Sequence, residues 1–470
     1  MRVINKIEKA YDRNLILIFE GDKEFCEYIS EDGKKLTATM IEKEEFTGKK
    51  GETLSVNFLQ NGKLISMDIL GFGKKEECSE NIFREVLFKY LSGKSGAILI
   101  SSNREELNRA DLICEIVGNI NYSFDEFKEK KSNKVDVEFF SSEVIDITES
   151  LILNEATDIT RNLVDLPANI INPITLSERV IELGKEFGFE VEIFDDEKIQ
   201  KLGMNLLYSV GKASATKPRL IVMRYFGDRE SEDIMGLVGK GLTYDTGGLC
   251  IKPADSMMNM KDDMTGGATV IGTMCAIAKN TLKKNVVAVV PACENAINGN
   301  SYRPGDIIQS MNGKYVEIIN TDAEGRLALA DAITYIVRDE KVSEIIDVAT
   351  LTGAMMVALG TFITGVFSNR DDVYSLLEKS CNKYGERVWR MPLNEEFAEE
   401  LKSEVADLKH MGNRWGGAIS AAKFLEIFAE GTPWTHMDIA GTAYNNSTKW
   451  YKKGASGVHV KGLYEYCKNR

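Results

Sequence analysis

The sequence predicts an α/β protein with a small N-terminal α/β domain and a larger C-terminal α/β domain whose mixed, mainly parallel sheet is flanked by helices. At 470 residues the chain is long for a single hydrophobic core, so two domains are expected. Short apolar runs alternate with runs of helical spacing in the second part of the chain, which is typical of a parallel sheet covered on both faces. The charge-rich, weakly periodic residues 128–136 mark the boundary between the two parts.

The first domain is predicted to cover residues 1–140. Its pattern alternates short strands and helices: strands at 15–19 and 96–101, a hairpin over 53–73 that turns at Asn61-Gly62, and a helix at 82–91. No constellation of reactive side chains occurs there. We therefore interpret residues 1–140 as an accessory or assembly domain.

The second domain is reached through one long helix. Residues 142–166 carry apolar side chains at helical spacing and precede Pro167, so residues 141–168 are predicted to form a connecting helix, and residues 169–470 a second domain. In that domain the sequence predicts strands at 191–194, 206–210, 219–223, 234–238, 286–290 and 344–348, and helices at 176–187, 266–278, 328–337 and 419–428.

Composition excludes several classes of function. The formal net charge of −14 argues against nucleic acid as a routine partner, since such binding draws on basic surface. The eight cysteines are scattered without paired spacing, which fits reduced thiols in a cytosol. The N-terminus lacks the apolar core of a signal peptide, and no stretch approaches the length of a membrane span, so we expect a cytoplasmic protein without a membrane partner.

Histidine is scarce. The three histidines, His410, His436 and His459, are not paired at ligand spacing, which argues against a Ser-His-Asp triad and an HExxH zinc site. Any catalysis must therefore use carboxylates, lysines, arginines or metal ions.

The stretch Asn-Thr-Asp-Ala-Glu-Gly-Arg-Leu at 320–327 places two carboxylates and an arginine between a predicted strand at 316–319 and the helix at 328–337. Ligands bind at such strand-to-helix junctions in α/β folds. Asp322 and Glu324 alternate with small residues, so in an extended conformation both would point to one side and share a cation. The alternative is a solvated turn whose aspartate caps the next helix.

Two further stretches carry charged side chains. A predicted strand runs into the glycine-rich residues 238–253, which hold Lys240, Asp245 and Lys252. Phosphate binding is disfavoured there, because the GxxxxGK[ST] spacing is absent and Tyr244 stands where GxGxxG needs its third glycine. In residues 260–268, Asp263 precedes a helix rich in small residues, where a simple N-cap is the alternative.

Together these stretches supply four carboxylates, Asp245, Asp263, Asp322 and Glu324. Like charges converge only where cations hold them. Oxygen ligands without cysteine or histidine suit magnesium, manganese or zinc in a two-metal site, and the chemistry implied is hydrolysis by a metal-activated water. A nearby lysine either donates its lone pair to a metal or, charged, stabilises an oxyanion.

The same residues resemble the leucyl aminopeptidase (cytosol aminopeptidase) family. The resemblance rests on NTDAEGRL at 320–327, VGKGxTxDTGGxxIKP at 238–253 and MKxDMxGG at 260–267. It continues through RNLVDLPAN at 161–169, ENxxxGNxYRPGDI at 294–307, DVATLTGA at 347–354 and WTHMDIAGTA at 434–443. These motifs span the whole second domain, and their length makes a chance match implausible.

The resemblance implies a role for each charged residue. The tighter metal would be held by Lys240, Asp245, Asp263 and Glu324, and the looser one by Asp245, Glu324 and Asp322 with its backbone carbonyl. Lys252 would polarise the scissile carbonyl, and Arg326 would hold a bicarbonate that acts as general base. The two divalent ions would be zinc or manganese, with magnesium or cobalt as alternatives.

The resemblance also implies the substrate and the assembly. Peptides with a free N-terminus and a leucine-like first residue would bind, oriented by the carbonyl of Leu351. The side-chain pocket would be lined by Met260, Thr350, Gly353, Ala440 and Ala443. Family members assemble as hexamers, so a homohexamer is expected. Two rival interpretations are a dinuclear phosphohydrolase, disfavoured by the missing phosphate loop, and a DNA-binding regulator, disfavoured by the acidic balance.

Overall fold

The computed structural model describes residues 1–9, 11–22, 29–60, 62–445 and 450–470. The chain divides into two compact units, Met1–Asn154 with Asn446–Lys453, and Glu155–Asn445 with Gly454–Arg470. Each unit combines a sheet with helices, so the predicted α/β class is confirmed. The domain limits drawn from the sequence at residues 140 and 168 stay a prediction.

The first unit contains a six-stranded sheet in the order β1-β6-β5-β2-β4-β3. Its strands are β1 (Arg2–Ile4), β2 (Arg13–Ile18), β3 (Thr53–Gln60), β4 (Lys63–Gly71), β5 (Gly96–Ser101) and β6 (Val135–Phe140), and its helices are α1 (Glu31–Lys43), α2 (Glu80–Leu91) and α3 (Ala110–Asn121). The predicted hairpin is the antiparallel pair β3–β4, whose turn residue Asn61 lies outside the described residues.

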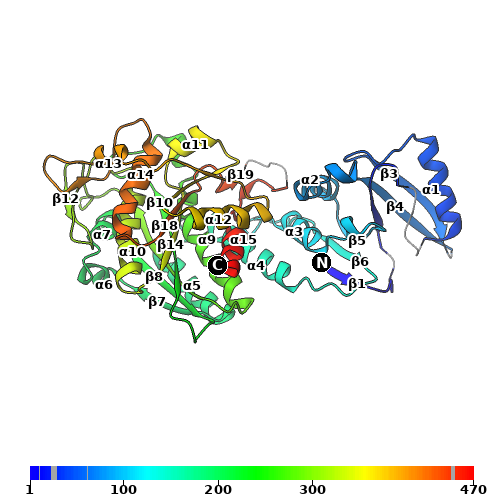
Figure 1. The fold of residues 1–470 in the computed structure, drawn as a ribbon, viewed down its shortest axis with the longest axis horizontal. Coiled ribbons are helices and arrows are strands. Elements are labelled where there is room, and N and C mark those ends of the chain that lie inside the picture. The colour runs from blue at the N-terminus through cyan, green and yellow to red at the C-terminus, as the bar shows by residue number, and fades with distance from the viewer. Residues whose placement is uncertain (10, 23–28, 61, 446–449) are drawn as a thin grey trace. The chain divides into compact units, whose positions relative to one another are not determined.

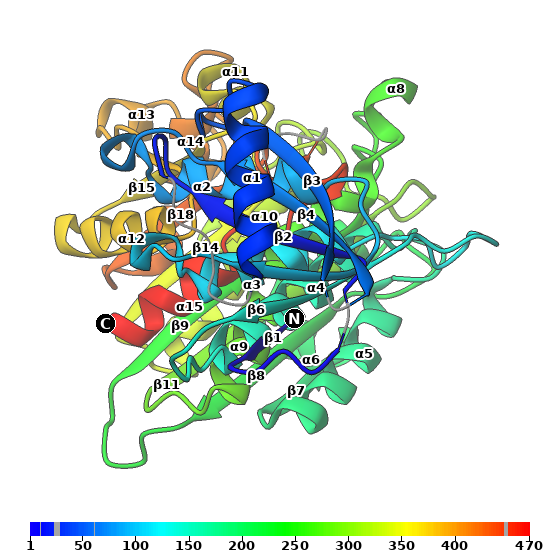
Figure 2. The same cartoon turned by 90° about the vertical axis from the view of Figure 1, so that its right-hand side faces the viewer.

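Alternation along β2 divides the core of this unit into two layers. Leu15 and Leu17 pack with the apolar faces of α2 and α3, whereas Ile16 and Ile18 belong to the cluster beneath α1. Successive side chains of a strand point to opposite faces, so α1 covers one face of the sheet and α2 with α3 the other (Figure 2).

The second unit is built on a nine-stranded sheet in the order β16-β15-β18-β14-β9-β11-β8-β7, with β10 paired to β11. Its strands β7, β8, β10, β14 and β18 are labelled in Figure 1. Its strands are β7 (Glu190–Phe194), β8 (Arg219–Phe226), β9 (Ile234–Gly239), β10 (Gly241–Asp245), β11 (Asn285–Asn295), β14 (Glu344–Ala349), β15 (Thr364–Ser368), β16 (Val388–Arg390) and β18 (Trp434–Asp438). Strands β10, β11, β9, β14 and β18 pair in parallel.

Helices cover both faces of this sheet. The helices from the connecting helix onward are α4 (Thr148–Asp165), whose first residues belong to the first unit, α5 (Pro173–Phe187), α6 (Asp196–Lys201), α7 (Asn205–Gly211), α8 (Ala254–Met257), α9 (Thr265–Lys279), α10 (Glu324–Arg338), α11 (Gly353–Leu359), α12 (Asp371–Lys383), α13 (Glu396–Glu399), α14 (Gly417–Glu426) and α15 (Val460–Asn469). Helices α9 and α10 both pack against strands β9 and β11. Helix α9 also contacts α15 and α5, whereas α10 contacts α7 and α14. Short strands complete the unit: β12 (Ile307–Gln309), β13 (Tyr315–Glu317), β17 (Leu408–Lys409), β19 (Tyr444–Asn445) and β20 (Gly454–Ala455).

Three predicted elements differ from the structure. Residues 206–210, expected as a strand, lie in helix α7, because so short an apolar run does not distinguish a buried strand from a buried helix. The strand expected at 316–319 is the short β13, which pairs with β12 and β17 outside the main sheet. The connecting helix begins at Thr148 rather than at residue 142. The Asp146 side chain accepts a hydrogen bond from the Thr148 N–H at this start. Among the described residues, no helix is long and apolar enough to cross a membrane.

Candidate metal centre

The charged residues predicted from the sequence gather at one edge of the main sheet. The neighbouring parallel strands end at Gly239 (β9), Asp245 (β10), Asn295 (β11), Ala349 (β14) and Asp438 (β18). Lys240 follows β9 directly, and Thr350 follows β14. The carboxyl ends of parallel strands are where open α/β sheets place their ligands.

Lys240 is the centre of the first group of contacts. Its Nζ lies 2.7 Å from Asp263 Oδ1 and 3.0 Å from Glu324 Oε1, and it donates to the carbonyl oxygen of Thr350 at 3.0 Å. The Thr350 hydroxyl donates to the same Asp263 oxygen at 2.8 Å. Burial alone would lower the pKa of Lys240, but the carboxylates of Asp263 and Glu324 outweigh it and raise this pKa, so in the metal-free site Lys240 carries a positive charge among them.

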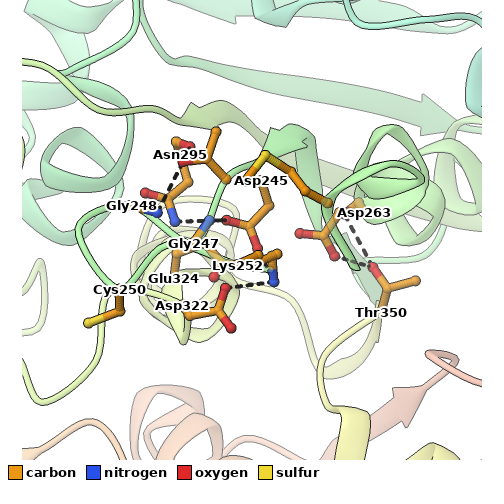
Figure 3. Close-up of polar contacts among 12 residues, drawn as sticks. Asp245, Gly247, Gly248, Cys250, Lys252, Asp263, Asn295, Asp322, Glu324 and Thr350 are labelled. Atoms are coloured by element: carbon orange, nitrogen blue, oxygen red, sulfur yellow. Dashed lines mark hydrogen bonds and ion pairs between the residues drawn. The ribbon is translucent and has the colours of Figure 1, made fainter. Parts of the chain in front are cut away.

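Lys252 is the centre of the second group. Its Nζ lies between Asp245 Oδ2, at 2.8 Å, and Asp322 Oδ1, at 2.6 Å (Figure 3). The other oxygen of Asp245 accepts hydrogen bonds from the backbone N–H of Gly247 and from Asn295 Nδ2, both at 2.8 Å. Lys252 and two fixed donors therefore hold Asp245 in one orientation.

The donor set fits divalent cations. Carboxylate oxygens of Asp245, Asp322 and Glu324 lie within 4.8 Å of one another. Asp263 Oδ2 and Glu324 Oε2 are buried without a hydrogen-bond partner. Burial raises the pKa of Asp245 and Asp263, and the neighbouring Glu324 charge raises both further. Four carboxylates face only two lysines, so the cluster has oxygen lone pairs and negative charge left over for hard cations.

Local backbone structure brings these segments together. Gly247 has φ +85°, a conformation that favours glycine, and a Cβ there would lie 2.8 Å from Asp322 Oδ1. The Thr321 hydroxyl donates to the Gly247 carbonyl at 2.6 Å and accepts from the Cys250 N–H at 2.8 Å. The glycine-rich loop is thus tied to the stretch at 320–327, while the Cys250 side chain points away from the carboxylates (Figure 3).

The reason given above for pairing Asp322 with Glu324 is wrong, although the structure brings the two side chains together. The segment is not extended, because Asp322 lies in a turn and Glu324 is the first residue of α10. A change of backbone direction therefore aims the two carboxylates at one place.

The N-cap alternative for Asp263 also differs from the structure. Asp263 lies in the 3-10 helix η3 (Met260–Met264), Met264 is the N-cap residue of α9, and the Asp263 carboxylate contacts Lys240 and Thr350. The adjacent Asp262 is less enclosed, and burial raises the pKa of its carboxyl to about 6.

Arg326 is buried beside the carboxylates. Its Nη1 donates to the backbone carbonyl of His410 at 2.9 Å, its Nε has no hydrogen-bond partner, and burial lowers its pKa to about 10. His410 in turn contacts the segment before the acidic stretch: its Nε2 lies 2.9 Å from the Asn320 carbonyl oxygen, and its Nδ1 accepts from the Ile319 N–H at 3.2 Å. Burial, followed by the nearby charge of Arg326, lowers the pKa of His410 to about 4, so a neutral imidazole holds this loop in place.

The residues predicted to bind substrate stand on three segments around the charged groups. Met260 begins η3, Thr350, Leu351 and Gly353 follow β14, and Ala440 and Ala443 follow β18. Thr350 is the member that touches the charged groups directly, through Lys240 and Asp263. Whether the six line one pocket stays a prediction.

Sequence reasoning missed two residues of this edge, Asn295 and Asp438. Asn295 holds Asp245 and donates to the Thr321 carbonyl at 2.9 Å. Asp438 accepts from the backbone of the segment after β14. Both are the last residues of strands, and the predicted strand at 286–290 stopped five residues before the end of β11. The predicted strand at 286–290 could have been extended to Asn295, but no strand was predicted at 434–438 and nothing pointed to Asp438.

Comparisons with known proteins cover nearly the whole chain. The model of the cytosol aminopeptidase family's catalytic domain matches residues 158–464, and that of its N-terminal domain matches residues 16–131. A probable cytosol aminopeptidase of Fusobacterium nucleatum subsp. nucleatum is 45% identical over 470 residues, covering 99% of this chain and 98% of the relative. One from Aquifex aeolicus is 41% identical, covering 96% and 94%. The solved structure of the bottromycin maturation enzyme BotP in complex with Mn is 29% identical, with a TM-score of 0.85 over 98% of this chain and 99% of that chain.

Proposed function

Since this chain belongs to the cytosol aminopeptidase family and is therefore a metal-dependent aminopeptidase, we propose that it holds two divalent ions and releases leucine-like residues from the free N-termini of peptides. The observation that carries the dinuclear part is the pair of buried, unpartnered oxygens, Asp263 Oδ2 and Glu324 Oε2, within a cluster of four carboxylates and two lysines. One cation would use these two oxygens, and a second the Asp245–Asp322–Glu324 group.

Two divalent ions would supply Lewis acidity and lower the pKa of water, which is the chemistry that peptide hydrolysis at neutral pH requires. The tighter ion would be held by Asp245, Asp263, Glu324 and Lys240, whose amine would bind it in the neutral form because the adjacent cations lower its pKa, and the looser one by Asp245, Asp322 and Glu324. Zinc and manganese are the proposed ions, with magnesium or cobalt as alternatives, and the Mn complex of BotP supports manganese.

The chain's own residues act on the substrate through charge and position. Lys252 lies at the Asp245–Asp322 edge with a raised pKa, because these carboxylates outweigh the effect of burial, so it is charged and suited to stabilising an oxyanion that develops in the transition state. Arg326 has a buried Nε without a partner, a donor suited to a small planar anion such as bicarbonate, which would serve as general base.

The preference for leucine-like residues rests on the apolar character of the predicted pocket, Met260, Thr350, Gly353, Ala440 and Ala443. We further propose a homohexamer, as the family resemblance implies, and a cytosolic location, as the names of the relatives suggest.

The test uses the whole protein stripped with a chelator and then given back Zn²⁺, Mn²⁺, Mg²⁺ or Co²⁺ one at a time. Leucine p-nitroanilide should be cleaved after metal is restored, whereas N-acetyl-leucine p-nitroanilide should not, since acylation removes the amine's lone pair. Similar turnover of the blocked and free substrates would exclude an aminopeptidase that reads the amine. Hydrolysis of p-nitrophenyl phosphate instead of the anilide would favour the phosphohydrolase.

A further inference from the structure

We propose that Asp438 is a positioning residue of this site, one that fixes the backbone of residues 350–352 and through it holds Lys240 and directs the Leu351 carbonyl. The part concerning Leu351 rests on the function proposed above. The part concerning Lys240 rests on contacts alone.

Asp438 ends β18 and is buried, with 1% of its surface exposed. Its Oδ1 accepts from the N–H groups of Leu351 at 3.2 Å, Thr352 at 3.5 Å and Ala440 at 3.2 Å. Its Oδ2 accepts from the Thr352 hydroxyl at 2.7 Å. One carboxylate therefore ties the segment after β14 to the segment after β18, the two segments that carry most of the predicted substrate pocket.

The first effect passes through the peptide group between Thr350 and Leu351. In a trans peptide the N–H and C=O point in opposite directions, and the described chain has no cis bonds. The Leu351 N–H points at Asp438, so the Thr350 carbonyl points away from it, and that carbonyl accepts from Lys240 Nζ at 3.0 Å. The Asp438 carboxylate at one end and the Lys240 amine at the other hold the same rigid group, and the hydrogen bonds at its two ends strengthen each other.

The second effect passes through the next peptide group. The Thr352 N–H also faces Asp438, so the Leu351 carbonyl points to the opposite side, where the family resemblance places the substrate. The Thr352 hydroxyl that donates to Asp438 also accepts from the Met355 N–H at 3.1 Å and starts helix α11. Rotation of either peptide group would therefore break contacts to Asp438.

A carboxylate is a costly acceptor at this depth. Burial raises the pKa of Asp438, and the nearby His436 opposes this rise. A neutral acceptor could satisfy the same amides with less desolvation. The charge of Asp438 is therefore expected to matter through the Thr350–Leu351 peptide group, whose carbonyl accepts from Lys240.

The experiment compares Asp438→Ala and Asp438→Asn with a matched control, Asp347→Asn. Asp347 is a buried carboxylate on the neighbouring strand β14, where it contacts His436 Nδ1 at 2.6 Å and the Trp434 indole at 2.7 Å. Binding of Mn²⁺ and Zn²⁺ is measured by chelator competition, and kcat and KM are measured with leucine p-nitroanilide. Both assays are run at a temperature well below the lowest Tm of the variants. Tm itself is measured separately.

Asp438→Ala should weaken binding of the tighter metal and lower kcat, each by about 10- to 100-fold, the scale for losing an outer partner of a metal ligand. Asp438→Asn keeps one oxygen for the amides but loses the charge, so its losses should be about 3- to 10-fold. Asp347→Asn should lower Tm while leaving metal affinity and kcat within about twofold of wild type.

The proposal is overturned if Asp438→Ala lowers Tm but the folded protein keeps wild-type metal affinity and kcat. It is also overturned if Asp347→Asn loses metal to the same extent, since the effect would then be general loosening. Should Asp438→Ala fail to fold, unchanged metal affinity in Asp438→Asn refutes the proposal. If the wild-type protein cleaves no aminoacyl substrate while metal affinity still follows the expected order, the proposed function fails and the positioning of Lys240 stands.

Discussion

Gly325 offers a sharp test of the geometry around Lys240, because the residue has no side chain where Lys240 passes over α10. A Cβ added at Gly325 would lie 2.3 Å from Lys240 Cε and 2.6 Å from its Nζ. The position is the second residue of α10, and its φ is not in the left-handed region, so alanine suits the backbone itself. Gly325→Ala therefore perturbs the lysine and leaves the helix intact.

The size of the effect follows from the distances. Non-bonded carbon atoms approach to about 3.5 Å, so the Lys240 side chain must retreat by roughly 1 Å. Its Nζ now makes contacts of 2.7 Å to Asp263, 3.0 Å to Glu324 and 3.0 Å to the Thr350 carbonyl, and a shift of that size takes them beyond hydrogen-bond distance. A displacement of about 1 Å in a catalytic site can cost about 100-fold in rate.

Folding stability should respond much less. Alanine gains up to about 1 kcal/mol of helix propensity over glycine, less near a helix end, and this partly offsets the weaker Lys240 contacts. We therefore expect Gly325→Ala to lower kcat/KM and metal affinity by about 100-fold while Tm changes by only a few degrees.

The assay pairs kcat/KM for leucine p-nitroanilide with metal content after dialysis, using Gly299→Ala as the control. Gly299 is exposed, and a Cβ there meets nothing within 4 Å. Wild-type activity and metal content in Gly325→Ala would show that Lys240 can move freely, which would refute its assignment as a fixed ligand.

Further changes test the other residues. Lys252→Ala should lower kcat by roughly 10² to 10³ with metal content unchanged, since it removes one oxyanion donor, and metal loss in this variant would contradict that role. Glu324→Ala should abolish activity and lower the number of bound ions, whereas Asp322→Ala should empty mainly the looser site. Two tightly bound ions in Glu324→Ala, found by metal analysis, would reject Glu324 as a ligand shared by both ions. Burial, followed by the charge of Arg326, lowers the pKa of His410 from 6.5 to about 4, so its stabilising contribution is complete above pH 6.5 and is lost as pH falls towards 4. That contribution is at most about 3 kcal/mol, and wild type should lose Tm more steeply than His410→Gln over this range, while equal slopes would contradict it.

The main elements of the second unit could be predicted because their apolar patterns are long or regular. The buried run at 286–290 is the first half of β11, and the small-residue pattern at 266–278 is α9. The segment at 206–210 was misassigned because an apolar run of five residues is too short to distinguish a buried strand from a buried helix. Tertiary packing, here of α7 against α10, selects the helix.

The charged side chains of the site could also be predicted, but their contacts could not. Asp245, Asp263 and Glu324 were recognisable as carboxylates near element ends, yet which lysine each one faces depends on the parallel order β11-β9-β14-β18. Asn295 and Asp438 gave no signal as reactive groups, because they act by holding other groups.

The arrangement of charge explains why such holding residues are needed. Four carboxylates drawn together in a buried site repel one another, and a lysine from another segment helps to hold each in place: Lys240 for Asp263 and Glu324, Lys252 for Asp245 and Asp322. Each lysine must in turn be held against the pull of two acids, and for Lys240 that restraint is the Thr350 carbonyl. The Thr350 carbonyl holds the Lys240 amine in place only if its peptide group cannot rotate. The peptide group is fixed by Asp438 at the end of β18. Asp438 does not contact the metal ligands directly, yet it is therefore expected to control the affinity of the site for the tighter metal.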